Sequence, residues 1–425
     1  MFSINTVILI SIIFAVAYFP RVRCWFASFK PQKKMHSDVQ HKLALFIPAR
    51  NEGKAIIPLL DSIAAQTYDR SNFDVFVIVK DPEDEVYKYA EAVGAEVFCD
   101  QTQTCKGDCL DFGFNKIIHT YPGKYEAFVI VDADCVLKPT FIEEMNNAMA
   151  DGADIINGKK LVRNYFEENG KNSNIVTQCN GLIWTFMDDM GNRWKSDHGY
   201  TTMTITTGIL ISARLVEKWD GWIYKSTLTE DMELQRDCCL QGYKTQYYSY
   251  AQLYMEEAPQ LAETDKRRTR WMTGLTHADF IYARNLLAKR DVHSIADNYF
   301  MFSLWIVYAY IASMFIIALG NIGSCVFQII RLGKFDWSLL IVSAVALAAV
   351  YGIFFILTAA SLVVAYKDMK LPLSQRLKVL FVHPVFYMQY ITIVARAIID
   401  RREKSWDEIA RVETVETAET TDKVL

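Results

Sequence analysis

The sequence has little that would mark a nucleic-acid-binding, zinc-binding or disulfide-stabilised protein. Its formal net charge of −4 provides no basic surplus for a phosphate backbone. The nine cysteines form no C-x-x-C pair, and no pair of histidines joins them at metal-ligand spacing. We therefore predict reduced cytosolic thiols, no structural zinc site and no nucleic-acid partner.

Charged residues are absent from several long stretches of the chain. None occurs from Phe2 to Phe19, from Asn298 to Ile330 or from Trp337 to Tyr366. Each of these runs is long enough to cross a bilayer, and soluble core helices rarely lack charge for so many turns. A further run, Val379 to Ala395, holds only His383 as an ionisable group and could span, re-enter or lie in the interface. The sequence thus predicts an integral membrane protein in contact with membrane lipids.

Basic residues beside these runs indicate the orientation. They follow the first run (Arg21, Arg23, Lys30, Lys33 and Lys34) and separate the last two (Lys367, Lys370, Arg376 and Lys378). Because Lys and Arg are enriched on the cytoplasmic side, both groups favour that side. The alternative to an anchor is a cleaved signal peptide, but here the basic residues come after the apolar run and no small-residue cleavage site is evident. We expect an uncleaved anchor, a plasma-membrane location, and a catalytic domain and tail in the cytoplasm.

The middle of the chain alternates between short apolar runs and helical patterns. The expected strands are Leu43–Ile47, Phe73–Val79, Glu96–Phe98 and Ala127–Val131, and the expected helices include Ile56–Ala65 and Val86–Val93. This alternation predicts a mostly parallel sheet covered on both faces, in which ligands bind beyond the carboxyl ends of the strands. We divide the chain into an anchor and linker (1–39), a globular domain with an interfacial segment (40–291), membrane helices (292–400) and a polar tail (401–425).

Polar clusters follow three of the expected strands. They are Pro48–Gly53, Lys80–Asp84 and Asp132–Asp134. Two acids around a small residue often face solvent, but Asp132 and Asp134 come directly after a buried strand, where carboxylates are costly unless a cation or hydrogen bonds satisfy them. Hard oxygen ligands suit Mg²⁺ or Mn²⁺, which also bind substrate phosphates.

Two later clusters each permit two interpretations. Thr229-Glu230-Asp231 precedes the helical pattern Met232–Leu240, so Thr229 could be a helix N-cap and the acids could favour the helix dipole; equally, the acids could be catalytic. The run Asp265–Trp271 is rich in arginine. It could contact anionic lipid close to the membrane, or it could balance the charge of a diphosphate leaving group.

Taken in order, these clusters resemble the motifs of the membrane-integrated glycosyltransferases of family 2. The set comprises P-A-R-N-E at Pro48, the K-D turn at Lys80, Lys106-Gly107, D-A-D at Asp132, T-E-D at Thr229 and R-R-T-R-W at Arg267. That group includes cellulose, hyaluronan, chitin and poly-N-acetylglucosamine synthases. The resemblance implies an α/β GT-A-type domain combined with transmembrane helices, a UDP-sugar donor, a saccharide or lipid acceptor, and inversion at the anomeric carbon.

The resemblance also implies roles for individual residues. The positions expected to bind the donor are Glu52, Asp81, Lys106, Asp132 and Arg270. Asp134 and Asp132 match the metal and diphosphate motif, and the implied cofactor is Mg²⁺ or Mn²⁺. Asp231 matches the catalytic base, with Glu230 beside it in the same motif. The positions expected to contact the acceptor are Trp271, Thr207, Gly208 and Arg267.

Two departures from the family pattern affect the predicted function. Arg267 replaces the usual Gln of Q-x-x-R-W, as in the ceramide glucosyltransferase variant of the motif, and Lys80-Asp81-Pro82 stands where many relatives have two acids and a glycine. We predict a synthase that extends and exports a β-linked polysaccharide, with transfer of a single sugar to a membrane lipid as the alternative. A transporter is disfavoured because the apolar runs contain almost no ionisable residues, which transport paths usually carry. An inactive scaffold is disfavoured because all the expected acids are present. The segment Arg401–Ile409 resembles the tails of bacterial members, or is an amphipathic surface segment.

Overall fold

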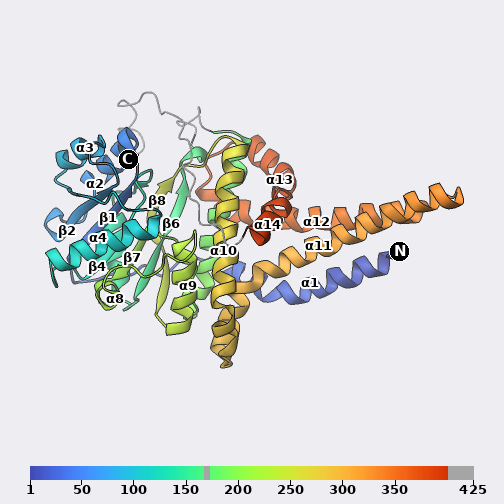
Figure 1. The fold of residues 1–425 in the computed structure, drawn as a ribbon, viewed down its shortest axis with the longest axis horizontal. Helices are drawn as coiled ribbons and strands as arrows, with labels where there is room; N and C mark the ends of the chain where they lie inside the picture. The colour runs from blue at the N-terminus through green and yellow to red at the C-terminus, as the bar shows by residue number, and fades with distance from the viewer. Residues whose placement is uncertain (167–172, 401–425) are drawn as a thin grey trace.

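A computed structural model describes residues 1–166 and 173–400 of the chain. A rounded α/β domain forms one end of the molecule, and long helices project from the other (Figure 1). Helix α10 (Leu261–Ala288) lies at the junction between the two. The predicted tail, including Arg401–Ile409, lies outside the described residues.

A single mixed sheet forms the centre of the α/β domain. Its eight strands in the described part of the chain have the order β3-β2-β1-β4-β7-β6-β8-β5. The strands are β1 (Leu43–Ala49), β2 (Phe73–Val79), β3 (Glu96–Cys99), β4 (Ala127–Ile130), β5 (Val136–Leu137), β6 (Ile155–Val162), β7 (Ile209–Ser212) and β8 (Thr245–Met255). Strands β1 to β4 pair in parallel, whereas β7 is antiparallel to both β4 and β6. The four strands expected from the sequence are all present.

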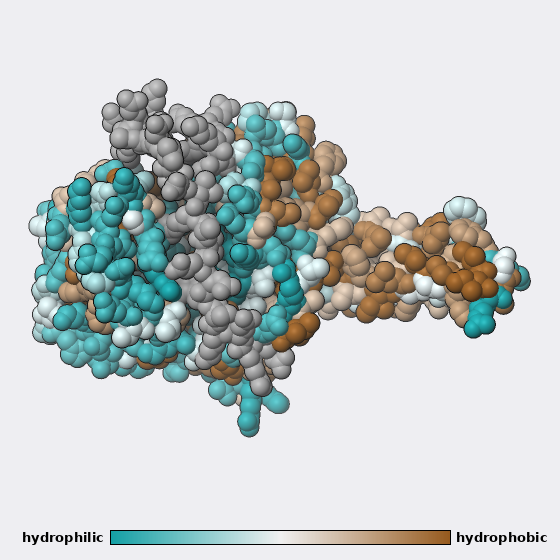
Figure 2. All heavy atoms as spheres, turned by 45° about the horizontal axis from the view of Figure 1, so that its top comes forward, coloured by the Kyte–Doolittle hydropathy of each residue, from teal (hydrophilic) through white to brown (hydrophobic). Residues whose placement is uncertain are grey.

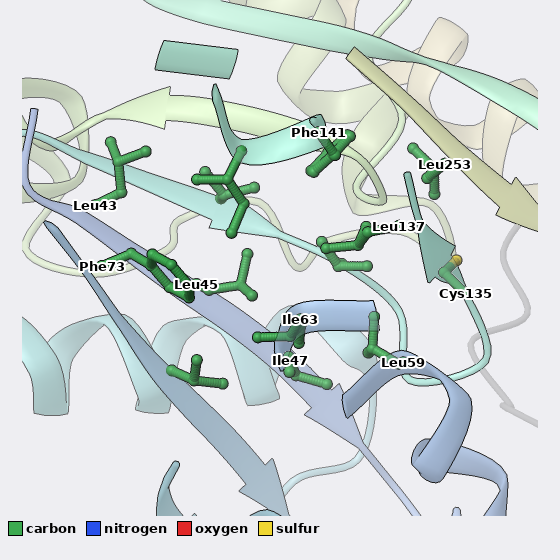
Figure 3. Close-up of a cluster of buried hydrophobic side chains, with 14 of the residues drawn as sticks. Leu43, Leu45, Ile47, Leu59, Ile63, Phe73, Cys135, Leu137, Phe141 and Leu253 are labelled. Atoms are coloured by element: carbon green, nitrogen blue, oxygen red, sulfur yellow. The ribbon is translucent and has the colours of Figure 1, made fainter. Parts of the chain in front are cut away.

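Helices cover both faces of this sheet, as its apolar strands require. Along β1, Leu43, Leu45 and Ile47 point to one face, where Figure 3 shows them packing with Leu59 and Phe141. That face is covered by α2 (Ile57–Ala64), α3 (Val86–Ala92) and α5 (Phe141–Met149). The other face is covered by α4 (Lys106–Thr120), α8 (Ala213–Trp219) and α9 (Glu230–Gln241).

A helical insertion between β6 and β7 connects the sheet to the membrane helices. It consists of α6 (Ile175–Met187), a π-helical turn (Asp188–Asn192) and α7 (Arg193–Asp197). Lys159 of β6 bridges this insertion and the membrane segment, since its Nζ lies 2.8 Å from Asp189 and 2.7 Å from Asp368. Short 3₁₀ turns lie at Phe26–Phe29, Gly53–Ile56, Arg70–Asn72, Arg163–Tyr165 and Ala365–Lys367.

Four segments within the described residues are long and apolar enough to cross a membrane. Three contain the long helices α1 (Ile4–Trp25), α11 (Val292–Leu332) and α12 (Trp337–Val364). They pack together through Val7, Met314 and Val342, while apolar side chains such as Ile316 and Ile356 face outward. Figure 2 shows the resulting hydrophobic exterior of the projecting helices.

The fourth segment, Leu373–Ile399, is broken into two helices. Helix α13 (Leu373–Tyr387) contains Pro384 and lies along α12, where the Tyr351 hydroxyl donates to the Phe381 carbonyl over 3.0 Å. Helix α14 (Tyr390–Ile399) turns back and packs on α10. At its end, Arg396 forms a two-point ion pair with Asp265 at 2.6 and 2.8 Å. Leu373–Ile399 as a whole is long and apolar enough to cross a membrane, so whether it spans, re-enters or lies in the interface stays a prediction.

Candidate active site

A large cavity lies at the carboxyl ends of β1 and β4. Its volume is about 2720 Å³, and it reaches from the sheet to the membrane helices. Arg50, Asn51 and Glu52 follow β1 and line it, as do Asp132 and Asp134 after β4. Parallel neighbouring strands end at the same edge of a sheet, so these two clusters meet there, whereas the third polar cluster, Lys80–Asp84 after β2, does not contribute to the lining.

Lys106 links two of the predicted acidic clusters. It is the first residue of α4, and its Nζ lies 2.5 Å from Asp132 Oδ1 and 3.9 Å from Glu230 Oε1. The same ammonium donates to the Thr206 carbonyl over 2.9 Å. Burial alone would lower the pKa of Lys106, but the charges of Asp132 and Glu230 outweigh it and raise that pKa. The lysine therefore stays protonated between the two carboxylates.

Asp231 occupies the first turn of α9 and lines the cavity. Burial, reinforced by the charge of Glu230, raises the pKa of Asp231 to about 7. Glu230 itself accepts a hydrogen bond from the Thr206 hydroxyl over 2.5 Å. Thr229 stands at the N-cap position, but its side chain makes no capping hydrogen bond, so helix capping does not account for this sequence. A carboxylate with a pKa near neutrality is suited to proton transfer.

Asp132 and Asp134 are the residues that could hold a divalent metal. Burial and the charge of Asp134 raise the pKa of Asp132, against the opposing effect of Lys106, so this pair of carboxylates calls for further positive charge. No cluster of three or more His, Cys, Asp or Glu side chains suited to a metal occurs among residues 1–166 and 173–400. The pair fits Mg²⁺ or Mn²⁺ if substrate phosphate oxygens complete the ligand set.

Helix α10 brings the arginine-rich cluster to the same cavity. Gly274 allows this close approach, because a Cβ there would lie 2.4 Å from Thr229 Oγ1. Arg270 faces the acids: burial lowers its pKa, while Glu230, Asp231 and Asp132 oppose that shift. Trp271 meets Trp184 edge-on at 5.7 Å and, like Arg267, lines the cavity.

Glu257 supports this cluster and was not singled out from the sequence. It is 2% exposed and accepts a hydrogen bond from Trp184 Nε1 over 2.6 Å. Its other oxygen lies 3.4 Å from Arg268 and 3.9 Å from Arg267. The only signal in the sequence was an acidic pair following an apolar strand, which is also typical of a surface turn. Glu257 therefore holds Trp184 and two arginines at the cavity wall.

Two predicted site residues lie apart from the cavity lining. Asp81 is exposed in the turn after β2, where its side chain accepts from the Glu83 amide over 2.9 Å. Gly208 has a φ of +64°, and a Cβ there would lie 2.2 Å from Leu253 Cδ2. Its neighbour Thr207 does line the cavity, and the Thr207 hydroxyl accepts the Asp132 amide over 3.0 Å. Gly208 thus shapes the loop that positions Thr207.

The far half of the cavity lies among the membrane helices. Its walls come from α11, α12, α13 and α14, with residues that include Leu304, Val307, Phe354, Leu357, Tyr387 and Tyr390. Within the described residues, the lining does not extend past Tyr308 on α11 or start before Phe354 on α12. The outer ends of α1, α11 and α12 pack against one another instead. The cavity therefore combines a polar, acidic end with an apolar, aromatic end.

The chain is similar to a known protein family in sequence and to a solved structure in fold. A family model described as "Glycosyltransferase like family 2" matches residues 41–274. Mannosyltransferase PcManGT from Pyrobaculum calidifontis, solved in complex with GDP-Man and Mn²⁺, is similar in structure. Its TM-score is 0.55 at 16% identity, covering 93% of this chain and 98% of the other.

A second solved structure, S. aureus TarS 1–349 in complex with UDP-GlcNAc, has a TM-score of 0.41 at 13% identity, covering 82% of this chain and 92% of the other. No curated protein sequence matches the chain. The family match and the likeness to the mannosyltransferase confirm the predicted GT-A-type fold.

Proposed function

The chain belongs to the glycosyltransferase like family 2, and on that premise we propose that it transfers a sugar from a UDP-sugar to a lipid acceptor held in the membrane. One observation carries this proposal: the cavity beside Asp132 and Asp231 continues into an apolar half among α11 to α14. An acceptor with a polar head and an apolar tail matches both ends. The GDP-Man bound by the mannosyltransferase of similar structure supports a nucleotide-sugar donor.

The donor occupies the sheet end of the cavity in this proposal. Glu52, Lys106, Asp132 and Arg270 bind the nucleotide sugar, with Arg270 placed to balance the charge of the departing diphosphate. Asp134 and Asp132 would hold Mg²⁺ or Mn²⁺, which supplies electrostatic stabilisation of the leaving diphosphate when bound. The exposed position of Asp81 gives it no direct contact in this arrangement unless the turn after β2 moves.

Asp231 acts as the general base, with Glu230 beside it. The carboxylate takes the proton from an acceptor hydroxyl as that oxygen attacks the anomeric carbon, and the bond between this carbon and the diphosphate oxygen breaks. Glu230 keeps Lys106 and Thr206 in place and, through its charge, raises the basicity of Asp231. Trp271 offers a flat face to the acceptor, with Arg267 and Thr207 nearby on the cavity wall.

Lipid glycosylation is preferred here over polysaccharide export. A growing polymer would need a path across the whole bilayer, whereas the cavity lining stops at Tyr308 and Phe354 and the outer helices pack through Met314 and Ala346. Residues 40–291 would form the catalytic domain on the cytoplasmic face, with residues 1–39 as anchor and linker and 292–400 as membrane helices. The return of α14 to α10 is consistent with a cytoplasmic tail.

Filling the apolar half of the cavity with a larger side chain tests whether the tail of a lipid acceptor binds there. We expect Leu357→Trp to lower transfer to lipid at least about tenfold, because an added indole occupies space reserved for the acceptor tail. Release of UDP by hydrolysis of the donor should persist, because the sheet end is untouched. The measurement is UDP release from a panel of UDP-sugars by the chain in membranes, followed by sizing of the labelled product.

Ile356→Trp is the matched control, since Ile356 neighbours Leu357 on α12 but is 63% exposed on the outer surface. Equal loss in both variants would mean that the effect is not due to the cavity. A long polymer as the labelled product would reject single addition and favour the polysaccharide alternative.

The pH dependence of transfer tests the role of Asp231. Because burial and Glu230 raise the pKa of Asp231 to about 7, the base is ionised above that pH and protonated below it. Transfer should therefore fall as the pH drops below about 7. Turnover at saturating substrate, measured across neutrality, would check this. Glu230→Gln should move the midpoint to lower pH, since it removes a neighbouring negative charge; a flat profile would contradict the assignment.

A further inference from the structure

Two buried cations line the cavity away from the acidic end. Arg21, near the end of α1, is 9% exposed, and Lys195, in α7, is 3% exposed. Both belong to the cavity lining, together with Tyr18, Phe300 and Leu304 from the membrane helices. Neither has a part in the donor chemistry described above. They come from segments separated by more than half of the globular domain, so the fold alone brings them together.

Neither cation has an anionic partner within the described residues. No ion pair at 4.0 Å or less includes Arg21 or Lys195 in residues 1–166 and 173–400. Arg21 Nη1 is buried and donates no hydrogen bond within the described residues. A buried charge without a partner carries a large desolvation cost, so these positions call for an anion that the protein itself does not supply.

The charged groups nearest to Arg21 and Lys195 form hydrogen bonds or ion pairs with other residues. Asp297, the nearby carboxylate, accepts from the amide and the hydroxyl of Thr201, each over 2.8 Å. Arg236 is paired with Asp279 at 2.6 Å. Burial lowers the pKa of Lys195 to about 7, and the charge of Arg21 adds to this, while Asp297 and Cys24 oppose it. A bound anion would restore the ordinary protonation of this lysine.

The absence of a side chain at Gly191 leaves room for the Arg21 side chain to lie against the π-helical turn. A Cβ on Gly191 would approach Arg21 Nη2 to 3.3 Å and the Phe186 carbonyl oxygen to 2.8 Å. The guanidinium is thus held at the edge of the insertion that carries Lys195. Apolar and aromatic side chains of α1 and α11 surround the two cations on the membrane side. An anionic group attached to an apolar chain matches this combination of charge and surroundings.

We propose that Arg21 and Lys195 form a subsite for a phosphate group carried by the lipid acceptor, an inference that rests on the proposed function. Arg and Lys side chains bind phosphate through charge-assisted hydrogen bonds, and such bonds are strongest where water is excluded. The phosphate would sit between the lipid tail in the apolar half and the acceptor hydroxyl at Asp231. The subsite would thereby select phosphorylated lipids over neutral ones.

Farnesyl phosphate and farnesol are matched probes for this subsite. With the full chain in neutral detergent, tryptophan fluorescence should report binding of farnesyl phosphate at least about tenfold tighter than farnesol. Arg21→Gln and Lys195→Gln should each remove most of this preference, and Arg21→Lys should retain part of it. Arg23→Gln is the control, since Arg23 lies on the same helix, is exposed, and stacks on Trp194 rather than lining the cavity.

Thermal unfolding separates a binding role from a structural one. In the absence of ligand, Lys195→Met should raise Tm, because it removes a buried charge without a partner. Farnesyl phosphate should raise the Tm of the parent and not that of the variant. A fall in Tm with Lys195→Met, combined with equal affinity for the two probes, would overturn the subsite.

Two further experiments distinguish a lipid phosphate from a free phosphate, and failure of the subsite from failure of the proposed function. Inorganic phosphate that displaces farnesyl phosphate at equal concentration would show a site for free anions and overturn the lipid assignment. A chain that releases UDP from a UDP-sugar but binds both probes equally would contradict the subsite alone. A chain that prefers farnesyl phosphate through Arg21 and Lys195 yet releases no UDP would contradict the proposed function and leave the subsite supported.

Discussion

Asp231→Asn is expected to lower sugar transfer by roughly 10²–10⁴-fold while UDP-sugar affinity stays within about twofold. The amide has nearly the same volume as the carboxylate but cannot accept the proton of the acceptor hydroxyl. The Met232 amide now donates to Asp231 Oδ1 over 2.8 Å, and the Asn oxygen can accept the same bond, so the start of α9 should be preserved. Single-turnover transfer and equilibrium UDP-sugar binding, measured on the same preparation, would separate the two quantities.

Asp237→Asn serves as the control for this substitution. Asp237 lies on the same helix, accepts the Tyr224 hydroxyl over 2.7 Å, and is not part of the cavity lining. We expect nearly parental transfer from it. If Asp231→Asn retained activity within a few-fold of the parent, or lost donor binding and transfer to the same extent, Asp231 would not be the base.

Removal of divalent cations is expected to lower transfer at least about 100-fold. Lys106 compensates Asp132 over 2.5 Å, but one ammonium does not balance Asp132, Asp134, Glu230 and a donor diphosphate together. Excess EDTA, followed by titration with Mg²⁺ or Mn²⁺ and measurement of UDP release, tests this requirement. Restoration by Mg²⁺ or Mn²⁺ is the expected result.

The variant Asp134→Asn tests whether the requirement for a divalent cation arises from Asp134. It should raise the concentration of Mn²⁺ needed for half-maximal transfer, because one of the two proposed carboxylate ligands is lost. Glu217→Gln on α8 changes a carboxylate outside the cavity lining and should leave the Mn²⁺ requirement unchanged. Full turnover of verified metal-free protein would show that Lys106 and Arg270 alone stabilise the leaving group.

The fold could be predicted largely because its signals are local. The run from Leu43 to Ile47 alternates between two buried faces, and the polar residues after it fall at the strand end by the geometry of a parallel sheet. Uncharged runs likewise identify α11 and α12 without knowledge of their partners. The convergence of Asp132, Glu230 and Lys106 was anticipated through the family resemblance, and their contacts now give it a geometry.

What escaped prediction depends on contacts between distant segments. Glu257 reads as a surface acid until α10 places Arg268 and Trp184 beside it. Arg21 reads as a flanking charge, and only the insertion between β6 and β7 buries it beside Lys195. The break between α13 and α14 is equally non-local, since the uncharged run continues through it while packing on α12 and α10 decides where the chain turns.

The ion pair between Arg396 and Asp265 has a consequence for how the active site responds to its surroundings. Asp265 belongs to the same helix as Arg270 and Trp271, so the broken apolar segment of α13 and α14 is tied by an ion pair to the helix that forms one wall of the cavity. If α13 and α14 lie in the bilayer, as the sequence predicts, we expect a change in bilayer thickness to reach Arg270 and Trp271 through this ion pair. In the proposed function, the lipid surroundings would then act as an effector of sugar transfer.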